Sequence, residues 1–226
     1  MENFFKFILY VHIVTGTVAL FTGLVSILSK KGGTRHITFG RFYFWAMTFV
    51  FITGILVASY KYNRFLFLIA FLSYYSVFCG IRILKLKKLH KNQRPQWYDW
   101  LAGFLNGFAN LLFVILGITY LWRTNAHLGG PLLSLGFGLG GLYLTYTNLM
   151  PFIKKPKKPY HWYVSHIGNM MGGYIATFTA FLSTVVTRYD LMNPYLAFAL
   201  PSLIGIPAIV YWLQKTEKKF NRSTAS

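Results

Sequence analysis

The stretch KKPKKPYHWYVSHIGNMMGG, residues 154–173, passes from a run of lysines directly into an apolar segment. Small residues then recur every four positions, at Gly168, Gly172, Ala176 and Ala180, so that they form one stripe along a helix. In lipid, helices associate through such stripes and through polar contacts rather than by hydrophobic burial. A basic loop followed by a helix lined with small residues is therefore typical of a membrane protein.

Composition supports the same interpretation for the whole chain. Of its 226 residues, 55% are hydrophobic and 19% aromatic, and only 12% are charged. A soluble globular protein carries about 25% charged residues. One small globule cannot bury this much apolar surface, so we expect lipid to surround much of it. The single cysteine, Cys79, excludes an internal disulfide and a CxxC metal site.

Seven segments are long and apolar enough to cross a bilayer, which takes about 20 residues. They span residues 4–29, 42–60, 65–84, 98–122, 132–150, 162–187 and 196–213. The fifth is the least hydrophobic and the richest in glycine. The sequence thus predicts an all-α fold, a polytopic bundle of seven transmembrane helices. Residues 1–226 form a single domain that ends in a basic cytoplasmic tail, residues 214–226.

The distribution of positive charge predicts the orientation. Eighteen of the 23 lysines and arginines fall after the first, third and fifth segments and in the tail, and five fall on the opposite side. Cytoplasmic loops carry such an excess, so we expect the N-terminus outside and the C-terminus inside, in the bacterial inner membrane. Basic clusters between apolar segments suit anionic lipid at the cytoplasmic face. They argue against nucleic acid as the partner.

The alternation also allows an internal repeat. Segments one to three and five to seven cross the membrane in the same sense, with the fourth as a linker between them. A 3+1+3 parallel repeat of this kind occurs in transporters. Its sequence support is that His36 and His166 both lie near the inner start of a middle segment.

Ionisable residues inside a membrane are candidates for function. His12 lies within the first segment, His36 precedes the second, and His166 lies one turn into the sixth. At 1.5 Å per residue, the levels of His12 and His166 differ by roughly 19 Å, so these two cannot share one haem or metal. His36 and His166 can, if their helices are neighbours, and Asp99 is the only acid at that level. Three ligands on separate elements suit zinc or iron.

For other residues near these histidines, we predict a role in supporting the site or in helix packing. Gly40 shares a face with His36 and permits close approach, while Arg41 is expected to reach lipid phosphate. Met170 and Tyr174 follow His166 on the stripe that faces the bundle. His161 points about 140° away from His166 and is expected at the membrane edge. A hydrogen bond from His12 to a polar residue of a neighbouring helix is the structural alternative to a ligand role.

Two motifs carry a family resemblance. The pattern HxxxGR (His36, Gly40, Arg41) and the pattern HxxxMxxxY (His166, Met170, Tyr174) resemble an uncharacterised family of predicted bacterial multi-pass membrane proteins, a domain of unknown function. The stretch HIVTG, which begins at His12, is also similar. The resemblance implies a seven-span bundle in the bacterial inner membrane and no particular activity.

Three functions remain open from the sequence. The first is a metal- or haem-binding protein, with haem b or a divalent metal held by the histidines. The second is a small-molecule or lipid transporter. The third is an accessory or assembly subunit with a membrane-protein partner and purely structural histidines. A hydrolase is disfavoured, because no GxSxG or HExxH motif occurs and the chain has only four acids.

Overall fold

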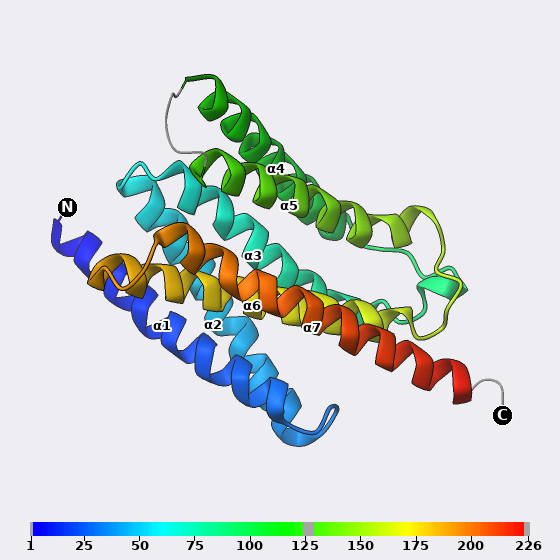
Figure 1. The fold of residues 1–226 in the computed structure, drawn as a ribbon. Coiled ribbons are helices and arrows are strands. Elements are labelled where there is room, and N and C mark those ends of the chain that lie inside the picture. The colour runs from blue at the N-terminus through cyan, green and yellow to red at the C-terminus, as the bar shows by residue number, and fades with distance from the viewer. Residues whose placement is uncertain (1, 124–128, 224–226) are drawn as a thin grey trace.

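The computed structural model describes residues 2–123 and 129–223, and every regular element within them is helical (Figure 1). The α-helices are α1 (Glu2–Leu28), α2 (Thr34–Tyr60), α3 (Arg64–Arg82), α4 (Trp97–Arg123), α5 (Gly129–Ile153), α6 (His161–Tyr189) and α7 (Pro194–Ser223). Two 3-10 turns, η1 (Ile83–Lys85) and η2 (Leu89–Lys91), lie between α3 and α4. The predicted all-α fold is confirmed.

Six helices within the described residues are long and apolar enough to cross a membrane, which makes a multi-pass membrane protein the class that the fold supports. Helix α5 is long enough but is not among the six. Its glycines and polar residues lower its mean hydropathy, as the sequence of the fifth segment indicated. A seventh crossing by α5 therefore stays a prediction.

Helices α2 and α7 extend furthest beyond the predicted segments, by eight residues at the start of α2 and by ten at the end of α7. Helix α2 begins at Thr34 rather than at residue 42, because the chain turns at Gly32, whose φ of 77° suits glycine, and Gly33 precedes the helix in extended conformation. His36 therefore lies in the first turn of a helix. Helix α7 continues to Ser223, so residues 214–223 of the predicted tail are helical, and residues 224–226 lie outside the described part.

Side-chain contacts explain why the tail stays helical. Tyr160 donates a hydrogen bond to Asn221 at 2.6 Å and stacks on Phe220, with ring centroids 4.7 Å apart. Lys158 forms an ion pair with Glu217 at 2.9 Å. The connection between α5 and α6 thus holds the C-terminal turns of α7 against the bundle.

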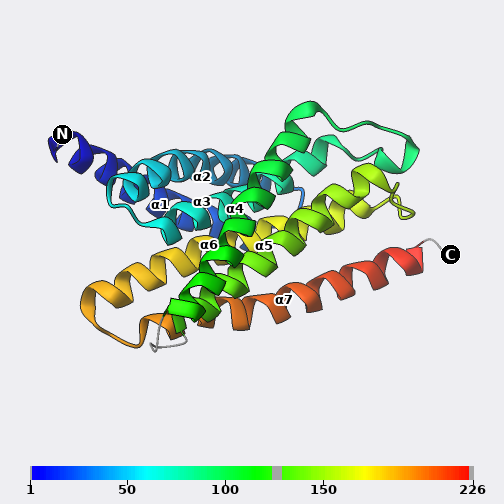
Figure 2. The same ribbon diagram turned by 90° about the horizontal axis from the view of Figure 1, so that it is seen from above.

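Helices α3 and α6 occupy the middle of the bundle (Figures 1 and 2). Helix α3 packs against α2, α4 and α6, and helix α6 also packs against α1 and α7. Helix α5 packs mainly along α4, whereas α1, α2 and α3 pack in chain order. The first and last three helices are thus arranged differently, and the 3+1+3 repeat stays a prediction.

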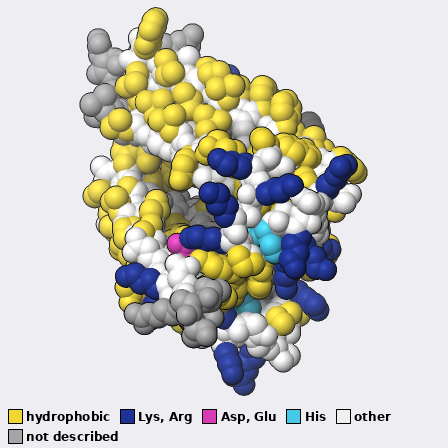
Figure 3. Space-filling model, turned by 90° about the vertical axis from the view of Figure 1, so that its right-hand side faces the viewer, with side chains coloured by type: hydrophobic (Ala, Val, Ile, Leu, Met, Phe, Trp, Pro, Cys, Tyr) yellow, Lys and Arg dark blue, Asp and Glu magenta, His cyan; other side chains and the backbone are white. Residues whose placement is uncertain are grey.

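Positive charge gathers at one end of the bundle. The α1–α2, α3–α4 and α5–α6 connections and the C-terminus lie at the right-hand end in Figure 1. Figure 3 shows this end, where lysine and arginine side chains cluster. The N-terminus and the α2–α3 and α6–α7 turns lie at the opposite end. We call the end that carries the α1–α2, α3–α4 and α5–α6 connections and the C-terminus the basic end.

Polar side chains form hydrogen bonds between neighbouring helices. Asn106 donates to Thr145 of α5 at 2.8 Å, and Asn148 and Asn169 exchange hydrogen bonds of 3.0 and 2.8 Å between α5 and α6. Asn110 is different, because its amide donates to the Asn106 carbonyl of its own helix at 2.7 Å. Its side chain packs against Gly141 of α5, where an added Cβ would clash with it.

Candidate functional site

His36 is attached to the end of α1 through its ring nitrogen. Its Nδ1 lies 2.9 Å from the carbonyl oxygen of Ser26, and the Ser26 hydroxyl donates to the His36 carbonyl at 3.2 Å. Because a carbonyl oxygen can only accept, Nδ1 carries the proton of the neutral ring. The lone pair of the neutral imidazole is then on Nε2.

His166 is held in the same way by another helix. Its Nδ1 donates to the carbonyl oxygen of Gly80 at 2.7 Å. Gly80 lies in the last turn of α3, where backbone carbonyls lack partners within the helix. The contact is close because Gly80 has no side chain: a Cβ there would lie 2.6 Å from the sulfur of Met170. The neutral His166 ring likewise has its lone pair on Nε2.

The two histidines are neighbours across the bundle. Their ring centroids are 6.2 Å apart and the ring planes are nearly perpendicular, at 84°. Both residues are half-buried, and within the described residues neither Nε2 has a hydrogen-bond partner. Helices α2 and α6, which are distant in sequence, therefore bring together two imidazoles with matched tautomers.

Asp99 does not join them, so the structure does not bring the expected His36, His166 and Asp99 ligand set together within the described residues. Asp99 is buried and accepts two hydrogen bonds from Arg82, at 2.6 and 2.8 Å, and one from the Gln96 backbone at 2.8 Å. Within the described residues no group of three His, Cys, Asp or Glu side chains is placed to hold a metal ion. The site consists of two histidines.

His12 contacts a polar residue of a neighbouring helix, which was the structural alternative to a ligand role. Its Nδ1 lies 2.9 Å from the hydroxyl of Thr53 in α2, and Gly54 gives its ring room. Ser26 contacts His36, and His12 lies fourteen residues earlier in α1, a distance of about 21 Å along the helix. His12 is therefore remote from the histidine pair.

Three of the four supporting residues, Gly40, Met170 and Tyr174, make packing contacts between helices. A Cβ on Gly40 would lie 3.4 Å from the Ser26 hydroxyl, so Gly40 faces α1. Met170 packs in the cluster around Tyr43, and the Tyr174 hydroxyl donates to the Leu20 carbonyl at 3.2 Å. Arg41 is exposed. Met170 and Tyr174 thus seat α6 against α1, α2 and α3.

Sequence reasoning missed a second histidine pair. His90 of η2 and His161, the first residue of α6, have ring centroids 5.8 Å apart. The buried atoms His90 Nδ1 and His161 Nε2 lack hydrogen-bond partners within the described residues. His161 is thus placed against the α3–α4 connection, and its position at the membrane edge stays a prediction. Seventy-one residues separate the two, and no motif in the sequence links them.

Comparison with known proteins gave no match to a family model, to a curated protein or to a solved structure. The family resemblance of the two motifs therefore stays a prediction. The chemistry of the His36 and His166 pair is the basis for a functional proposal.

Proposed function

We propose that this chain is a multi-pass protein of the bacterial inner membrane that binds a haem iron between His36 and His166, at a basic end that faces the cytoplasm. The location rests on six apolar helices, on the gathering of positive charge at one end and on the motif resemblance. The ligand rests on the histidine pair.

One observation carries the proposal: both Nδ1 atoms are bonded to backbone carbonyls, at 2.9 and 2.7 Å. Histidines that bind metals donate their second ring N–H to a carbonyl or carboxylate in this way, which orients the ring and raises its basicity. A single histidine with such a bond is common. Two side by side, with both Nε2 atoms unpartnered, form a pair of metal-ligand donors.

The number of ligands favours haem over a free divalent ion. Zinc sites use three or four protein ligands, and no third candidate lies beside the pair in the described residues. In haem the porphyrin supplies four nitrogens, so two imidazoles complete the iron coordination. The rings of His36 and His166, 6.2 Å apart between centroids, would hold the iron from two different helices.

The test is an absorption spectrum with iron analysis of the detergent-purified protein, expressed with haem precursor and iron. We expect a Soret band and one iron per chain, a shift of the band on reduction, and loss of the band in His36→Ala and in His166→Ala. Added imidazole should restore the band in each variant, which separates ligand loss from unfolding. His12→Ala, remote from the pair, is the control.

A wild-type protein that is folded but has neither a Soret band nor iron, even after incubation with haem, would refute the proposal. Loss of the band in His12→Ala to the same degree would also refute it, because the effect would then follow general destabilisation. Two alternatives would then remain. One is a transporter, and the other is an accessory subunit with purely structural histidines.

A further inference from the structure

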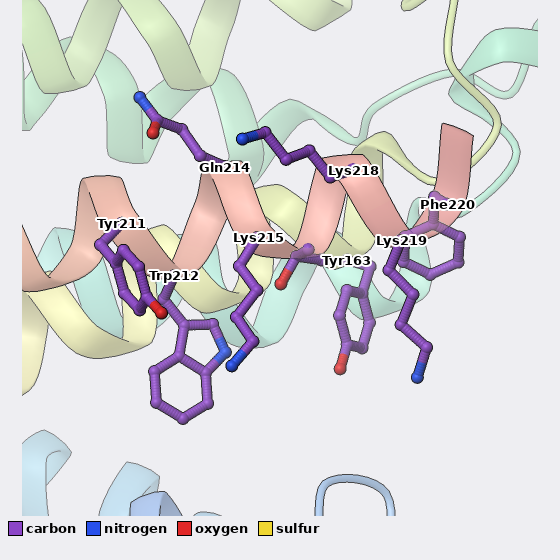
Figure 4. A pocket seen from close by; sticks show the side chains of 9 residues that line it. Tyr163, Tyr211, Trp212, Gln214, Lys215, Lys218, Lys219 and Phe220 are labelled. Atoms are coloured by element: carbon purple, nitrogen blue, oxygen red, sulfur yellow. The ribbon is translucent and has the colours of Figure 1, made fainter. Parts of the chain in front are cut away.

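A groove on the outside of the bundle runs along the last turns of α7. Its volume is about 1030 Å³, and its lining includes Tyr163 of α6 together with Tyr211, Trp212, Lys215 and Lys219 of α7. Figure 4 shows Trp212, Lys215 and Lys219 pointing to the same side of α7. Aromatic rings and ammonium groups thus line one concave surface.

Helix geometry orders these residues along α7. Positions 204, 211 and 215 share one face, because seven and eleven residues are close to two and three whole turns. That face begins with the exposed Ile204 (66%), continues through the ring of Tyr211 and ends at the ammonium group of Lys215. The order from apolar to aromatic to cationic matches the order from acyl chain to interface to headgroup in a lipid leaflet.

The depth of the groove agrees with this order. Trp212 lies eighteen residues after Pro194, the first residue of α7, a distance of about 27 Å along the helix. The hydrocarbon core of a bilayer is about 30 Å thick. If α7 crosses the membrane, Trp212 therefore lies at the headgroup level, and Lys215 and Lys219 lie one and two turns further out.

A third ammonium group approaches from the α1–α2 turn. Lys31 Nζ lies 5.9 Å from the centre of the Trp212 ring, within the range of a cation–π contact. It also bonds the carbonyl oxygen of Ile27. Partial burial lowers the pKa of Lys31, because the charged form loses solvent. An anion beside it would offset that loss.

No carboxylate neutralises these lysines in the described residues. Glu217, the only acid of α7, is bound to Lys158 at 2.9 Å. Asp99 is bound to Arg82, and Glu2 to Lys6. Asp190 caps α6 at the end of the bundle opposite the basic end. The groove therefore presents uncompensated positive charge beside an apolar surface.

We propose that this groove binds one anionic phospholipid, with the phosphate between Lys31, Lys215 and Lys219 and with an acyl chain along α7 toward Ile204. Charge complementarity selects an anionic headgroup, and the apolar and aromatic part of the groove selects a lipid over a soluble phosphate. A bound lipid would join α7 to the α1–α2 turn. The proposed lipid contacts include neither histidine, although Lys31 Nζ lies 3.5 Å from the Ser26 carbonyl oxygen that also binds His36 Nδ1.

Native mass spectrometry of the detergent-purified, delipidated protein tests the site, with phosphatidylglycerol and phosphatidylcholine as probes. We expect one phosphatidylglycerol per chain to be retained at least ten-fold more strongly than phosphatidylcholine. Lys215→Glu/Lys219→Glu should lower this retention at least ten-fold, and Lys31→Met roughly three-fold. The control Lys88→Glu/Lys91→Glu makes the same charge change in exposed residues of the α3–α4 connection and should retain the lipid.

Three results would overturn the proposal. Equal retention of both lipids, or of neither, would show that the groove does not select an anionic headgroup. An equal loss in the control variant would show that general charge, rather than the groove, attracts the lipid. Release of the lipid by millimolar inorganic phosphate would assign the lysines to a soluble anion. Circular dichroism of each variant verifies that the helices are intact.

Discussion

Arg82 at the end of α3 and Asp99 at the start of α4 form a two-pronged ion pair, with nitrogen–oxygen distances of 2.6 and 2.8 Å. The Asp99 side chain is only 2% exposed and that of Arg82 only 13%. Arg82 also lies over the ring of Tyr98, 4.7 Å from its centre. The ion pair joins the two ends of the α3–α4 connection. It also occupies the Asp99 carboxylate, so that Asp99 does not contact the histidines.

Removal of one partner should therefore destabilise the protein strongly. Arg82→Ala leaves a buried carboxylate without its cation, and we expect a loss of about 3–5 kcal/mol in the free energy of unfolding. Arg82→Ala/Asp99→Ala should recover much of that loss, because neither charge then remains buried. Thermal unfolding in detergent measures both.

The exposed pair of Lys158 and Glu217 is the matched control. Both side chains are more than a third exposed, so Glu217→Ala should cost less than about 1 kcal/mol. Arg82→Ala and Glu217→Ala melting at the same temperature would contradict the assignment of Arg82 and Asp99 as a buried structural pair.

Two glycines of α5 make a second comparison. A Cβ on Gly138 would lie 2.8 Å from the backbone nitrogen of Val114 and 3.0 Å from the carbonyl oxygen of Asn110, so Gly138→Ala must separate α4 from α5. Gly140 faces open space, with no atom within 4 Å of an added Cβ. We expect Gly138→Ala to cost about 1–3 kcal/mol.

Gly140→Ala should instead stabilise the protein by about 0.5–1 kcal/mol, because alanine favours the helix and meets no neighbour. The two variants carry the same added methyl group in the same helix, so the difference between their melting temperatures isolates the close approach at Gly138. Equal shifts would contradict the α4–α5 packing described above.

The sequence predicted the helical segments well, because membrane spans depend on length and hydropathy alone. Helix ends were less predictable. The residues around Gly32 and Gly33 resemble a loop, yet α2 begins at Thr34, since a two-glycine turn needs no further loop residues. The helical extension of α7 depends on contacts of Tyr160 with Asn221 and Phe220, which hydropathy does not report.

The site was predictable only in part. Depth along the membrane placed His36 and His166 at one level, and the structure makes them neighbours. Their partners, the carbonyls of Ser26 and Gly80, are backbone atoms that any residue type would supply, so the sequence carries no signal for them. Asp99 was misassigned because the sequence does not show that the α3–α4 connection folds back and brings Arg82 against it.

The exchange of hydrogen bonds between Asn148 and Asn169 links α5 to α6. Asn169 is buried and also donates to the Ser165 carbonyl at 2.9 Å. Asn148→Ala removes one partner and should cost about 1 kcal/mol, near the average for such bonds between membrane helices. Asn148→Ala/Asn169→Ala should cost less than the sum of the two single variants, because the same contact is removed once. Additive losses in thermal unfolding would show that the two side chains act independently.

The orientation of the bundle can be tested with single cysteines in a Cys79→Ala background. Tyr62 lies in the α2–α3 turn and is 92% exposed, whereas Lys155 is an exposed residue at the basic end. Because lysine-rich connections stay in the cytoplasm, a membrane-impermeant maleimide should label Tyr62→Cys on intact cells. It should label Lys155→Cys only after the membrane is opened. Labelling of Lys155→Cys on intact cells, with Tyr62→Cys protected, would reverse the proposed orientation and place the histidine pair and the lysine groove on the outer side.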